Sequence, residues 1–365
     1  MLGDTSTTLC CRQVIPLARA FGDFVSPHGD HHFAIGYDVR ESSPSLAEAV
    51  SMGLRSGGHH VTHIGACTAP RLQWYVAEEK FDGAIMLTGG KAPPQWNGMQ
   101  FYTADAVPVS AAELLESLHE SDLNHLFDDR CTNVLHQQDP LQAYAAQLRQ
   151  RFKPAAQFKL CLDAGNGLVG REVEAIVAHY RHLRLWRIAF KPDSAFPAHG
   201  TDPFAPAALE KAAQCVLGNG CDVGAIIDAD GETLAIVDEH GAAVAPAALG
   251  ALLSLRLAPS YPGRHVLLAP EVPAQIRNIL AEAGIPTRIF DGGPLAAYAA
   301  LRGDDASFYF DESGHYASCD FPSASNALLA LLELINHLTE TNHTLSRLLA
   351  DMFPPSAREP SRHRR

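Results

Sequence analysis

Three acidic residues at alternate positions form a candidate metal site. Asp228, Asp230 and Glu232 lie in the segment DADGE, directly after the apolar run GAII. Residues at alternate positions of an extended segment project from the same side, so the three carboxylates would share one face. Mg²⁺ takes oxygen ligands in proteins and usually keeps a phosphate oxygen as well. A solvated turn is the alternative interpretation, and the segment by itself does not separate the two.

A second candidate site is the segment DESGH, which places a carboxylate, a hydroxyl and an imidazole around a glycine turn. Its polar residues are Glu312, Ser313 and His315, preceded by Asp311. Such a group both accepts and donates hydrogen bonds in a fixed geometry, which suits the hydroxyl groups of a sugar. The alternative is that the turn itself requires these residues.

A third segment, LTGGKAPPQWNG, has the shape of a binding loop but holds no serine, cysteine, histidine or carboxylate. The backbone amides of Gly89 and Gly90, with the cation of Lys91, are candidates for holding a phosphate. Thr88 carries the segment's hydroxyl group. The sequence therefore predicts a phosphate-binding loop without an obvious nucleophile.

The elements that must position these segments alternate between short apolar runs and amphipathic helical stretches. This alternation predicts βαβ units and largely parallel sheets. Each of the three segments follows a predicted strand, and open α/β sheets bind ligands at the carboxyl ends of their strands. Three successive groups of similar length predict an α/β protein of three consecutive domains with mixed sheets. We place them at residues 1–138, 139–244 and 245–352, followed by a disordered basic tail at 353–365.

Composition excludes several function classes. The 365 residues include 41 Asp and Glu against 28 Lys and Arg, a net charge of −13, which disfavours a nucleic-acid partner. The chain lacks an 18-residue apolar run and a signal-peptide pattern at its start, so we expect a cytoplasmic protein without a membrane partner. The eight cysteines lack paired metal-ligand spacing and are expected to be reduced and buried.

Two histidine clusters and one cysteine pair are further candidates. One cluster holds His28, His31 and His32, the other His59, His60 and His63. Zinc or nickel binding is conceivable for such clusters, but we interpret them as exposed side chains at strand edges. Cys10-Cys11 is interpreted as a pair of reduced, buried thiols like the other cysteines, with a redox or metal site as the alternative.

The order of these motifs resembles the α-D-phosphohexomutase superfamily, which comprises the phosphomannomutase and phosphoglucomutase enzymes. The resemblance covers the chain from about residue 16 to 352. It rests on YDVRESSP near Asp38 and Arg40, on LDAGNGLVG, on PDSAFPAHGTDPF, and on the three segments described above. The family has T-A-S-H-N-P at the first segment, D-G-D-G-D-R at the second and E-x-S-G-H at the third.

The resemblance implies a phosphoserine that exchanges phosphate with the 1- and 6-positions of a hexose, helped by Mg²⁺. In this sequence Gly90 stands at the phosphoserine and Lys91 at the histidine after it. Glu232 replaces the third aspartate of the metal loop and Thr233 the arginine, so Mg²⁺ binding is expected to be weak. The third domain has Tyr298 near a lysine position. The family's opening segment and its phosphate-clamping fourth domain have no counterpart, so we expect both to be absent.

The sugar-binding residues Glu312, Ser313 and His315 remain while the phosphate chemistry is lost. The resemblance therefore implies a non-catalytic protein that binds a hexose phosphate, or a protein such as an active mutase or another sugar-pathway enzyme, as regulator or scaffold. The alternative is an active mutase of atypical site, using Thr88 or a fourth domain supplied by a partner.

Overall fold

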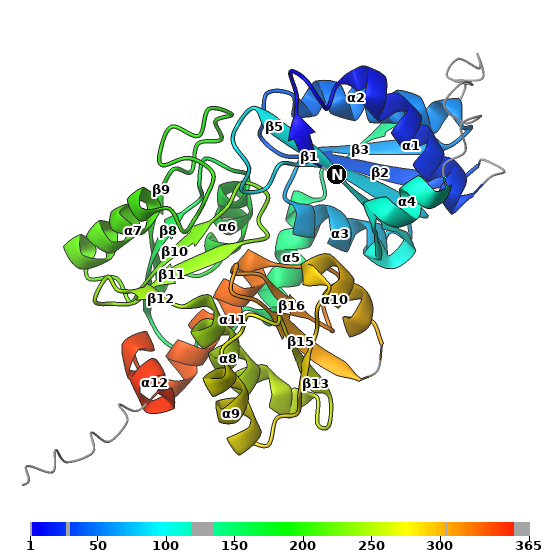
Figure 1. Ribbon diagram of the computed structural model, residues 1–365. Helices are drawn as coiled ribbons and strands as arrows, with labels where there is room; N and C mark the ends of the chain where they lie inside the picture. Colours follow the sequence, from blue (N-terminus) through cyan, green and yellow to red (C-terminus); the bar gives the residue numbers. More distant parts are fainter. Residues whose placement is uncertain (1, 27–29, 118–134, 304, 354–365) are drawn as a thin grey trace, which may run out of the picture.

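The computed structural model describes residues 2–26, 30–117, 135–303 and 305–353. Three α/β domains follow one another along the chain, each built on its own mixed sheet (Figure 1). The predicted fold class is confirmed. His28 and nearly all of the basic tail lie outside the described residues.

The first sheet has the strand order β1-β5-β4-β2-β3-β7, with β6 beside β5. Strands β2, β3, β4 and β7 are parallel, and β5 turns back antiparallel to β4. Phe33 and Ile35 of β2 pack against α1 and α2, whereas Ala34 between them packs on the side of α3. Its strands and helices are β1 (Leu2–Asp4), α1 (Cys11–Val25), β2 (His32–Tyr37), α2 (Ser43–Ser56), β3 (His60–Ala66), α3 (Ala69–Glu78), β4 (Gly83–Leu87), β5 (Trp96–Thr103), η1 (Ala104–Ala106), β6 (Pro108–Val109), α4 (Ala111–Ser117), β7 (Leu135–Gln137) and α5 (Leu141–Arg151).

The start of the chain is part of the first domain. Strand β1 pairs with β5, and α1 packs along α2. Val14, Ala18 and Phe21 recur at helical spacing and are buried. Neither element was predicted from the sequence.

The second sheet has the order β12-β11-β10-β8-β9, in which β8, β9 and β10 are parallel and β11 and β12 antiparallel. A turn at residues 239–241 joins β11 to β12. Helix α7 covers one face with Ala208, Ala212 and Val216. Its elements are β8 (Phe158–Asp163), α6 (Val169–Val177), β9 (Leu183–Ile188), α7 (Pro206–Asn219), β10 (Val223–Ile227), β11 (Leu234–Val237) and β12 (Ala243–Val244).

The third sheet has the order β14-β13-β15-β16, with β16 antiparallel to β15. The segment DESGH forms the turn of a hairpin between β15 and β16, where Gly314 at φ 86° and the hydrogen bonds of Asp311 turn the chain. The elements are α8 (Pro246–Leu257), η2 (Ala258–Ser260), β13 (His265–Leu268), α9 (Ala274–Glu282), β14 (Thr287–Ile289), α10 (Gly293–Leu301), β15 (Ala306–Phe310), β16 (Tyr316–Ser318), α11 (Ala327–Thr341) and α12 (Leu345–Met352).

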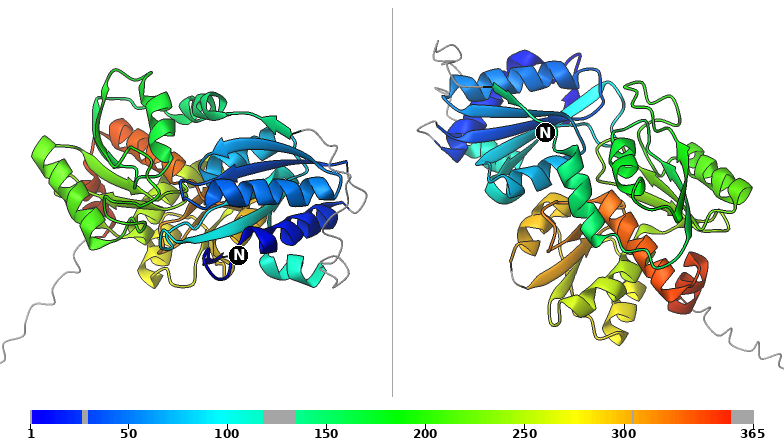
Figure 2. Two further views of the ribbon diagram at one scale, coloured as in Figure 1. Left: turned by 90° about the horizontal axis from the view of Figure 1, so that it is seen from above. Right: turned by 180° about the vertical axis from the view of Figure 1, so that it is seen from behind.

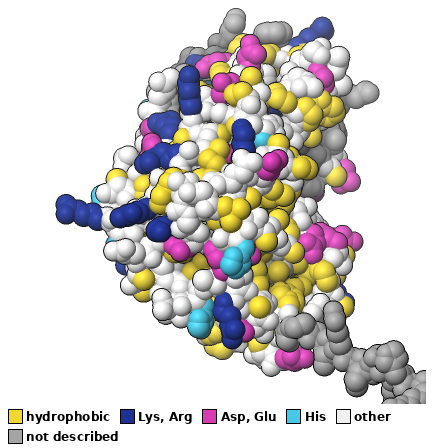
Figure 3. Space-filling view, turned by 90° about the vertical axis from the view of Figure 1, so that its left-hand side faces the viewer, with side chains coloured by type: hydrophobic (Ala, Val, Ile, Leu, Met, Phe, Trp, Pro, Cys, Tyr) yellow, Lys and Arg dark blue, Asp and Glu magenta, His cyan; other side chains and the backbone are white. Residues whose placement is uncertain are grey.

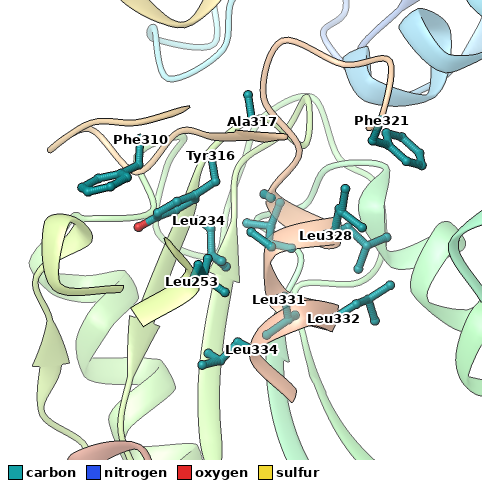
Figure 4. Packing of buried hydrophobic residues seen from close by; sticks show 14 of the residues in the cluster. Leu234, Leu253, Phe310, Tyr316, Ala317, Phe321, Leu328, Leu331, Leu332 and Leu334 are labelled. Carbon is teal, nitrogen blue, oxygen red and sulfur yellow. The ribbon is translucent and has the colours of Figure 1, made fainter. Parts of the chain in front are cut away.

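Helix α11 joins the second and third domains into one apolar core. Leu328, Leu331 and Leu332 lie in one buried cluster with Leu234 of β11 and Tyr316 of β16 (Figure 4). On its other side α11 runs beside α5 (Figure 2). The helix therefore covers the face of the second sheet that α7 leaves open, although it follows the third domain in the chain.

The surface carries charges of both signs. On the face shown in Figure 3, over the second domain, Lys and Arg side chains are interspersed with Asp and Glu. Among the described residues, none of the helices has the length and apolar character needed to cross a bilayer.

Candidate functional site

Three loops, one from each domain, meet at the carboxyl ends of β4, β10 and β15. The amide of Ala69 donates to the carbonyl of Asp230 (2.8 Å), and the amide of Leu234 donates to the carbonyl of Gly314 (3.0 Å). Lys91 Nζ donates to the carbonyl of Ser313 (3.3 Å). The structure thus brings together all three segments that the sequence singled out.

Thr88 lies at the centre of the junction between the first two domains. It is 4% exposed, and its Oγ1 lies 3.0 Å from Asp38 Oδ2 and 2.9 Å from Asp230 Oδ2. A hydroxyl group has one proton to donate, so it can serve only one of two ionised carboxylates. The other carboxyl group must carry a proton of its own.

Asp230 is the carboxyl group that is suited to carry this proton. Burial raises the pKa of Asp230 well above its usual value, and the neighbouring Asp228 and Asp38 raise it further. Asp38, in contrast, is paired with the Arg40 guanidinium at 2.5 Å. Thr88 therefore donates to Asp38, the carboxyl group paired with Arg40, and accepts from the protonated Asp230.

Arg40 ties the first loop to this network. Its side chain is fully buried, and its Nη2 donates to the carbonyls of Gly90 (3.0 Å) and Ala92 (2.7 Å). A Cβ at residue 89 would lie 2.6 Å from Arg40 Nε and 2.8 Å from the carbonyl oxygen of Trp96. Glycine at position 89, where the family has alanine, lets the guanidinium occupy this space.

Gly90 has a left-handed backbone conformation, with φ at 52°. A Cβ built on Gly90 would lie 3.4 Å from Asp230 Oδ2. A side chain at the phosphoserine position would therefore face the acidic loop of the second domain. The amides predicted to cradle a phosphate are used within the network, since Gly89 N donates to Asp38 (3.3 Å) and Gly90 N to Thr88 Oγ1 (3.0 Å).

The predicted trio of metal ligands is not assembled. Glu232 points to the first domain, where it accepts hydrogen bonds from Gln100 (3.1 Å) and Gln73 (3.5 Å). Nowhere in the described part of the chain is a group of three His, Cys, Asp or Glu side chains arranged to hold a metal ion.

The carboxyl groups of this loop are crowded and buried. Burial raises the pKa of Asp228, and it raises that of Glu232 to about 7 together with the nearby Asp230. A metal ion would bind only with loss of these protons. With Glu232 bonded to Gln73 and Gln100, the side chains as they lie do not form a ligand set for Mg²⁺.

Gln73 and its neighbours were missed in the sequence. The Gln73 amide nitrogen donates to Tyr102 (2.7 Å), and its oxygen accepts from the amide of Ala324 (2.7 Å). Tyr102 in turn donates to Gln100 (2.7 Å), which bonds Glu232. Gln73 thus contacts all three domains. The sequence held one sign of its role: Gln73 is a polar residue in a helix that is otherwise largely apolar around it.

The segment DESGH, which the sequence predicts to contact a sugar, is called the sugar loop below. Some of its side chains point inward and hold the turn, and others point outward. Asp311 accepts from the amides of Ser313 (2.9 Å) and His315 (3.0 Å) and lies 2.8 Å from His315 Nδ1. Burial alone would lower the pKa of His315, but the Asp311 carboxylate raises it above the usual value. A Cβ at Gly314 would lie 2.7 Å from the carbonyl oxygen of Leu234. Ser313 is exposed and Glu312 partly exposed, so these two face outward.

Lys91 links this loop to the second domain. Its carbonyl accepts from Thr201 Oγ1 (2.8 Å), and its Nζ lies 5.9 Å from the centre of the Phe204 ring. Thr201 and Phe204 come from the segment PAHGTDPF, which the sequence identified without assigning a role. Lys91 therefore places a cation between the second and third domains.

Tyr298, near a lysine position of the family, is buried. Its hydroxyl donates to the carbonyl of Asp105 (3.1 Å) in the first domain. It joins two domains rather than facing a ligand.

The interpretation of the histidine clusters as exposed was wrong for two members. His59 is fully buried and His63 is 7% exposed, because both lie beneath helix α2. Burial lowers the pKa of His59 to about 4. The expectation for the cysteines was also partly wrong, since Cys10 and Cys11 are exposed while Cys67, Cys161 and Cys221 are buried.

Two family models match the chain. They describe phosphoglucomutase/phosphomannomutase, alpha/beta/alpha domain I, at residues 3–122, and alpha/beta/alpha domain II, at residues 141–241. The likeness therefore begins near residue 3 rather than near residue 16, which corrects the expectation that the opening of the chain lacks a counterpart. This opening contains β1 and α1.

Known proteins agree with these models. The phosphohexose mutases of Xanthomonas campestris pv. campestris are 26% identical over 340 residues, which cover 91% of this chain and 75% of theirs. A phosphoglucomutase/phosphomannomutase family protein from Burkholderia thailandensis has a TM-score of 0.88 at 22% identity, covering 99% of this chain and 79% of its own. The N-acetylphosphoglucosamine mutase of Aspergillus fumigatus, solved with GlcNAc-6P and magnesium, has a TM-score of 0.54 at 13% identity, covering 88% of this chain and 65% of its own.

Proposed function

The chain belongs to the phosphoglucomutase/phosphomannomutase family, and on that premise we propose that it is a member without mutase activity. In this proposal it binds a hexose phosphate through Lys91, Glu312 and Ser313 and acts as a regulator or scaffold in carbohydrate metabolism. These three residues are assigned from the segments LTGGKAPPQWNG and DESGH, which resemble the family's first and third motifs.

The state of Thr88 carries the proposal. A phosphoryl carrier needs a free nucleophile, and Gly90 has no side chain at the phosphoserine position. The nearest hydroxyl, that of Thr88, is 4% exposed and held between two carboxyl groups at 3.0 and 2.9 Å. Displacement of a reacting group by ~1 Å already costs about 100-fold in rate. The loop that would supply metal ligands has Glu232 bonded elsewhere, so developing charge on a phosphoryl group would lack its usual stabilisation.

The solvent-accessible side chains of the sugar loop and of Lys91 support the binding of a hexose phosphate. Lys91 Nζ lies on the sugar loop at 3.3 Å from Ser313 O, and both Lys91 and Ser313 are accessible to solvent. A phosphate group would compete well for this cation, because the existing partner is a neutral carbonyl. Glu312 and Ser313 supply an acceptor and a hydroxyl beside it.

A mutase assay tests the loss of activity. Glucose 1-phosphate and mannose 1-phosphate are supplied with Mg²⁺ and the matching hexose bisphosphate, and turnover is compared with a buffer blank. We expect none from the natural sequence or from Gly90→Ser, with Gly90→Ala as the matched control. Turnover by the natural protein would overturn the proposal.

A titration tests the binding. Calorimetry with glucose 6-phosphate should show binding that Lys91→Met weakens about fivefold, corresponding to ~1 kcal/mol. Lys153→Met, a change of an exposed lysine outside the three loops, should leave it unchanged. Binding that is equal in all three proteins would refute the assigned site.

A second candidate function is an atypical active mutase that uses Thr88. The observation in its favour is the carboxylate of Asp38, 3.0 Å from Thr88 Oγ1, where a general base would stand. Phosphate found on Thr88 by mass spectrometry after incubation with hexose bisphosphate would favour it over the first candidate.

Two expectations stay predictions: the absence of a fourth domain and the protein partner. Intact-mass measurement of the protein from its source tests the first. Co-elution with an active phosphohexomutase from the same source in size-exclusion chromatography tests the second.

A further inference from the structure

The first domain has an open cavity of about 580 Å³ that none of the three loops lines. It lies at the carboxyl ends of β2, β3 and β7 and beside the first turns of α2. Ligands of α/β proteins bind outside such strand ends, and their pockets have volumes of roughly 300–1,000 Å³. Position and size are those of a small-molecule site.

His63 gives this cavity an unsatisfied polar group. The residue lines the cavity and is 7% exposed, and its Nε2 is buried without a hydrogen-bond partner. Burying an unpaired ring nitrogen costs free energy. Because Nε2 itself is out of contact with solvent, a small rotation of the ring toward the cavity would let a ligand's hydroxyl or amino group recover this free energy. Burial is the largest influence on the pKa of His63 and lowers it, so the ring is neutral at pH 7 and both donates and accepts.

The charges around the cavity disfavour an anionic ligand. Glu48 of α2 contributes an exposed carboxylate, and none of the described lining residues is a lysine or arginine. Asp139 lies 3.6 Å from Arg71 and 3.4 Å from Arg171, so its charge is offset. The remaining negative charge is that of Glu48, which attracts an amine and repels a phosphate.

Neutral polar groups complete the lining. Gln137 is an exposed residue of β7, and Tyr37 adds a ring and a hydroxyl at the end of β2. The Ser45 hydroxyl donates to the carbonyl of Ser42 (2.9 Å) and keeps its lone pairs available as acceptors. Amide, hydroxyl and imidazole groups around one aromatic ring match the alternating hydroxyl groups and apolar faces of a sugar.

We propose that this cavity is a second ligand site, which binds a non-phosphorylated polyhydroxylated molecule, a sugar or an amino sugar, through His63, Glu48 and Gln137. The site is independent of the hexose phosphate site proposed above. It goes beyond that function, since it would let the protein respond to an unphosphorylated sugar.

Saturation-transfer NMR on the full chain tests the site with three probes: glucose, glucosamine and glucose 6-phosphate. We expect glucosamine and glucose to bind. Glu48→Gln should weaken glucosamine about fivefold and leave glucose unchanged, because only the amine pairs with the carboxylate. Glu78→Gln, a change of an exposed glutamate outside the cavity, is the matched control.

Two further variants locate the site. His63→Leu should abolish binding of both unphosphorylated sugars. If the buried substitution prevents folding, Gln137→Ala on the exposed strand should weaken both about threefold. Lys91→Met should affect glucose 6-phosphate alone, which separates failure of this site from failure of the proposed function.

Three outcomes would overturn the proposal. The first is that neither sugar binds to the folded protein. The second is that both bind equally well to the Glu48, His63 and Gln137 variants. The third is that glucose 6-phosphate competes with glucosamine for one site.

Discussion

The loop after β4 and the loop between β15 and β16 come from matching places in two domains and yet differ in where their polar groups point. In the first, Thr88 is buried and bonded to Asp38, which is paired with the buried Arg40 in the loop after β2. In the second, Asp311 and His315 hold the turn from inside while Ser313 faces solvent. The first loop contacts a neighbouring domain, whereas the second presents side chains to solvent. The difference shows that equivalent strand ends in two domains can direct their polar groups to different surroundings.

The largest effect on stability should come from breaking the buried ion pair between Asp38 and Arg40, beside the loop after β4. Asp38→Ala leaves the fully buried Arg40 guanidinium without its carboxylate, which should lower the free energy of unfolding by about 3–5 kcal/mol. Urea denaturation measures this value. Glu41→Ala, at an exposed residue nearby, should change it by less than about 0.5 kcal/mol. An equal effect of both substitutions would contradict the role given to the pair.

A smaller loss is expected from two neighbouring glycines. Gly89→Ala places a methyl group 2.6 Å from Arg40 Nε and should cost about 2–3 kcal/mol. Gly90→Ala meets only Asp230 Oδ2 at 3.4 Å and should cost about 1 kcal/mol, for its left-handed backbone. The same denaturation experiment ranks the two, and a reversed order would show that Arg40 is not held as described.

The third effect depends on pH. The pKa of Glu232 is raised to about 7, so between pH 4.5 and 7 the folded protein binds more protons than the unfolded chain. Stability from this group is full below that range and falls as pH rises through it. Glu232→Gln does not ionise and keeps its amide neighbours. It should therefore be about 1–2 kcal/mol more stable than the natural protein at pH 8, with the difference vanishing near pH 4.

Thermal unfolding at a series of pH values measures this difference. Gln is also a donor and can repel the Gln73 and Gln100 amides, so Glu232→Met serves as a second variant without a titrating group. Identical pH profiles for all three proteins would show that Glu232 is ionised in the folded state.

A fourth, smaller effect on stability comes from His315 in the sugar loop, whose stabilising contribution falls as pH rises. The pKa of His315 is raised beside Asp311, so its contribution to stability is present below the unfolded pKa and is lost as pH rises through the folded pKa. His315→Gln should cost about 1 kcal/mol at pH 6 and less at pH 9. A loss that does not change with pH would mean that the imidazole is neutral.

The smallest effect on stability should be that of Ser313→Ala. The residue is exposed, and its removal should change the free energy of unfolding by less than about 0.5 kcal/mol. It should nevertheless weaken glucose 6-phosphate binding in calorimetry. A change in stability without one in binding would assign Ser313 to the turn alone.

The position of each loop at the end of an apolar strand was predictable from the sequence, and open α/β sheets bind ligands at such ends. The meeting of the three loops was not, because their strands belong to three separate sheets that come together only when the domains dock. The hydrogen-bond partners of these loops were not predictable either. Gln73 lies on a helix and contacts Glu232 and Ala324, which are far away in the sequence, only once three domains have docked. The direction of Glu232 likewise depends on amides of the first domain. The spacing of its carboxylate from Asp230 predicted a common side, and packing against Gln100 overrode it.

Burial of single residues was also out of reach of the sequence. His59 precedes β3 and His63 lies in its middle, and nothing in their spacing indicates that α2 covers them. The start of the chain was missed for another reason. β1 is three residues long, and its pairing with β5 is set by residues about 95 positions away.

The position of α11 has a consequence for the order in which the protein forms during synthesis. The sheet of the second domain is finished at Val244, yet the helix that covers one of its faces starts only at Ala327. At 5–20 residues per second, a ribosome adds the intervening stretch of roughly 80 residues in about 4–16 s. During that time Leu160, Leu234 and Ile236 lack the leucines of α11 that cover them in the finished protein. The nascent second domain is therefore a candidate client for chaperones that bind apolar β-sheet surfaces until the last long helix has been made.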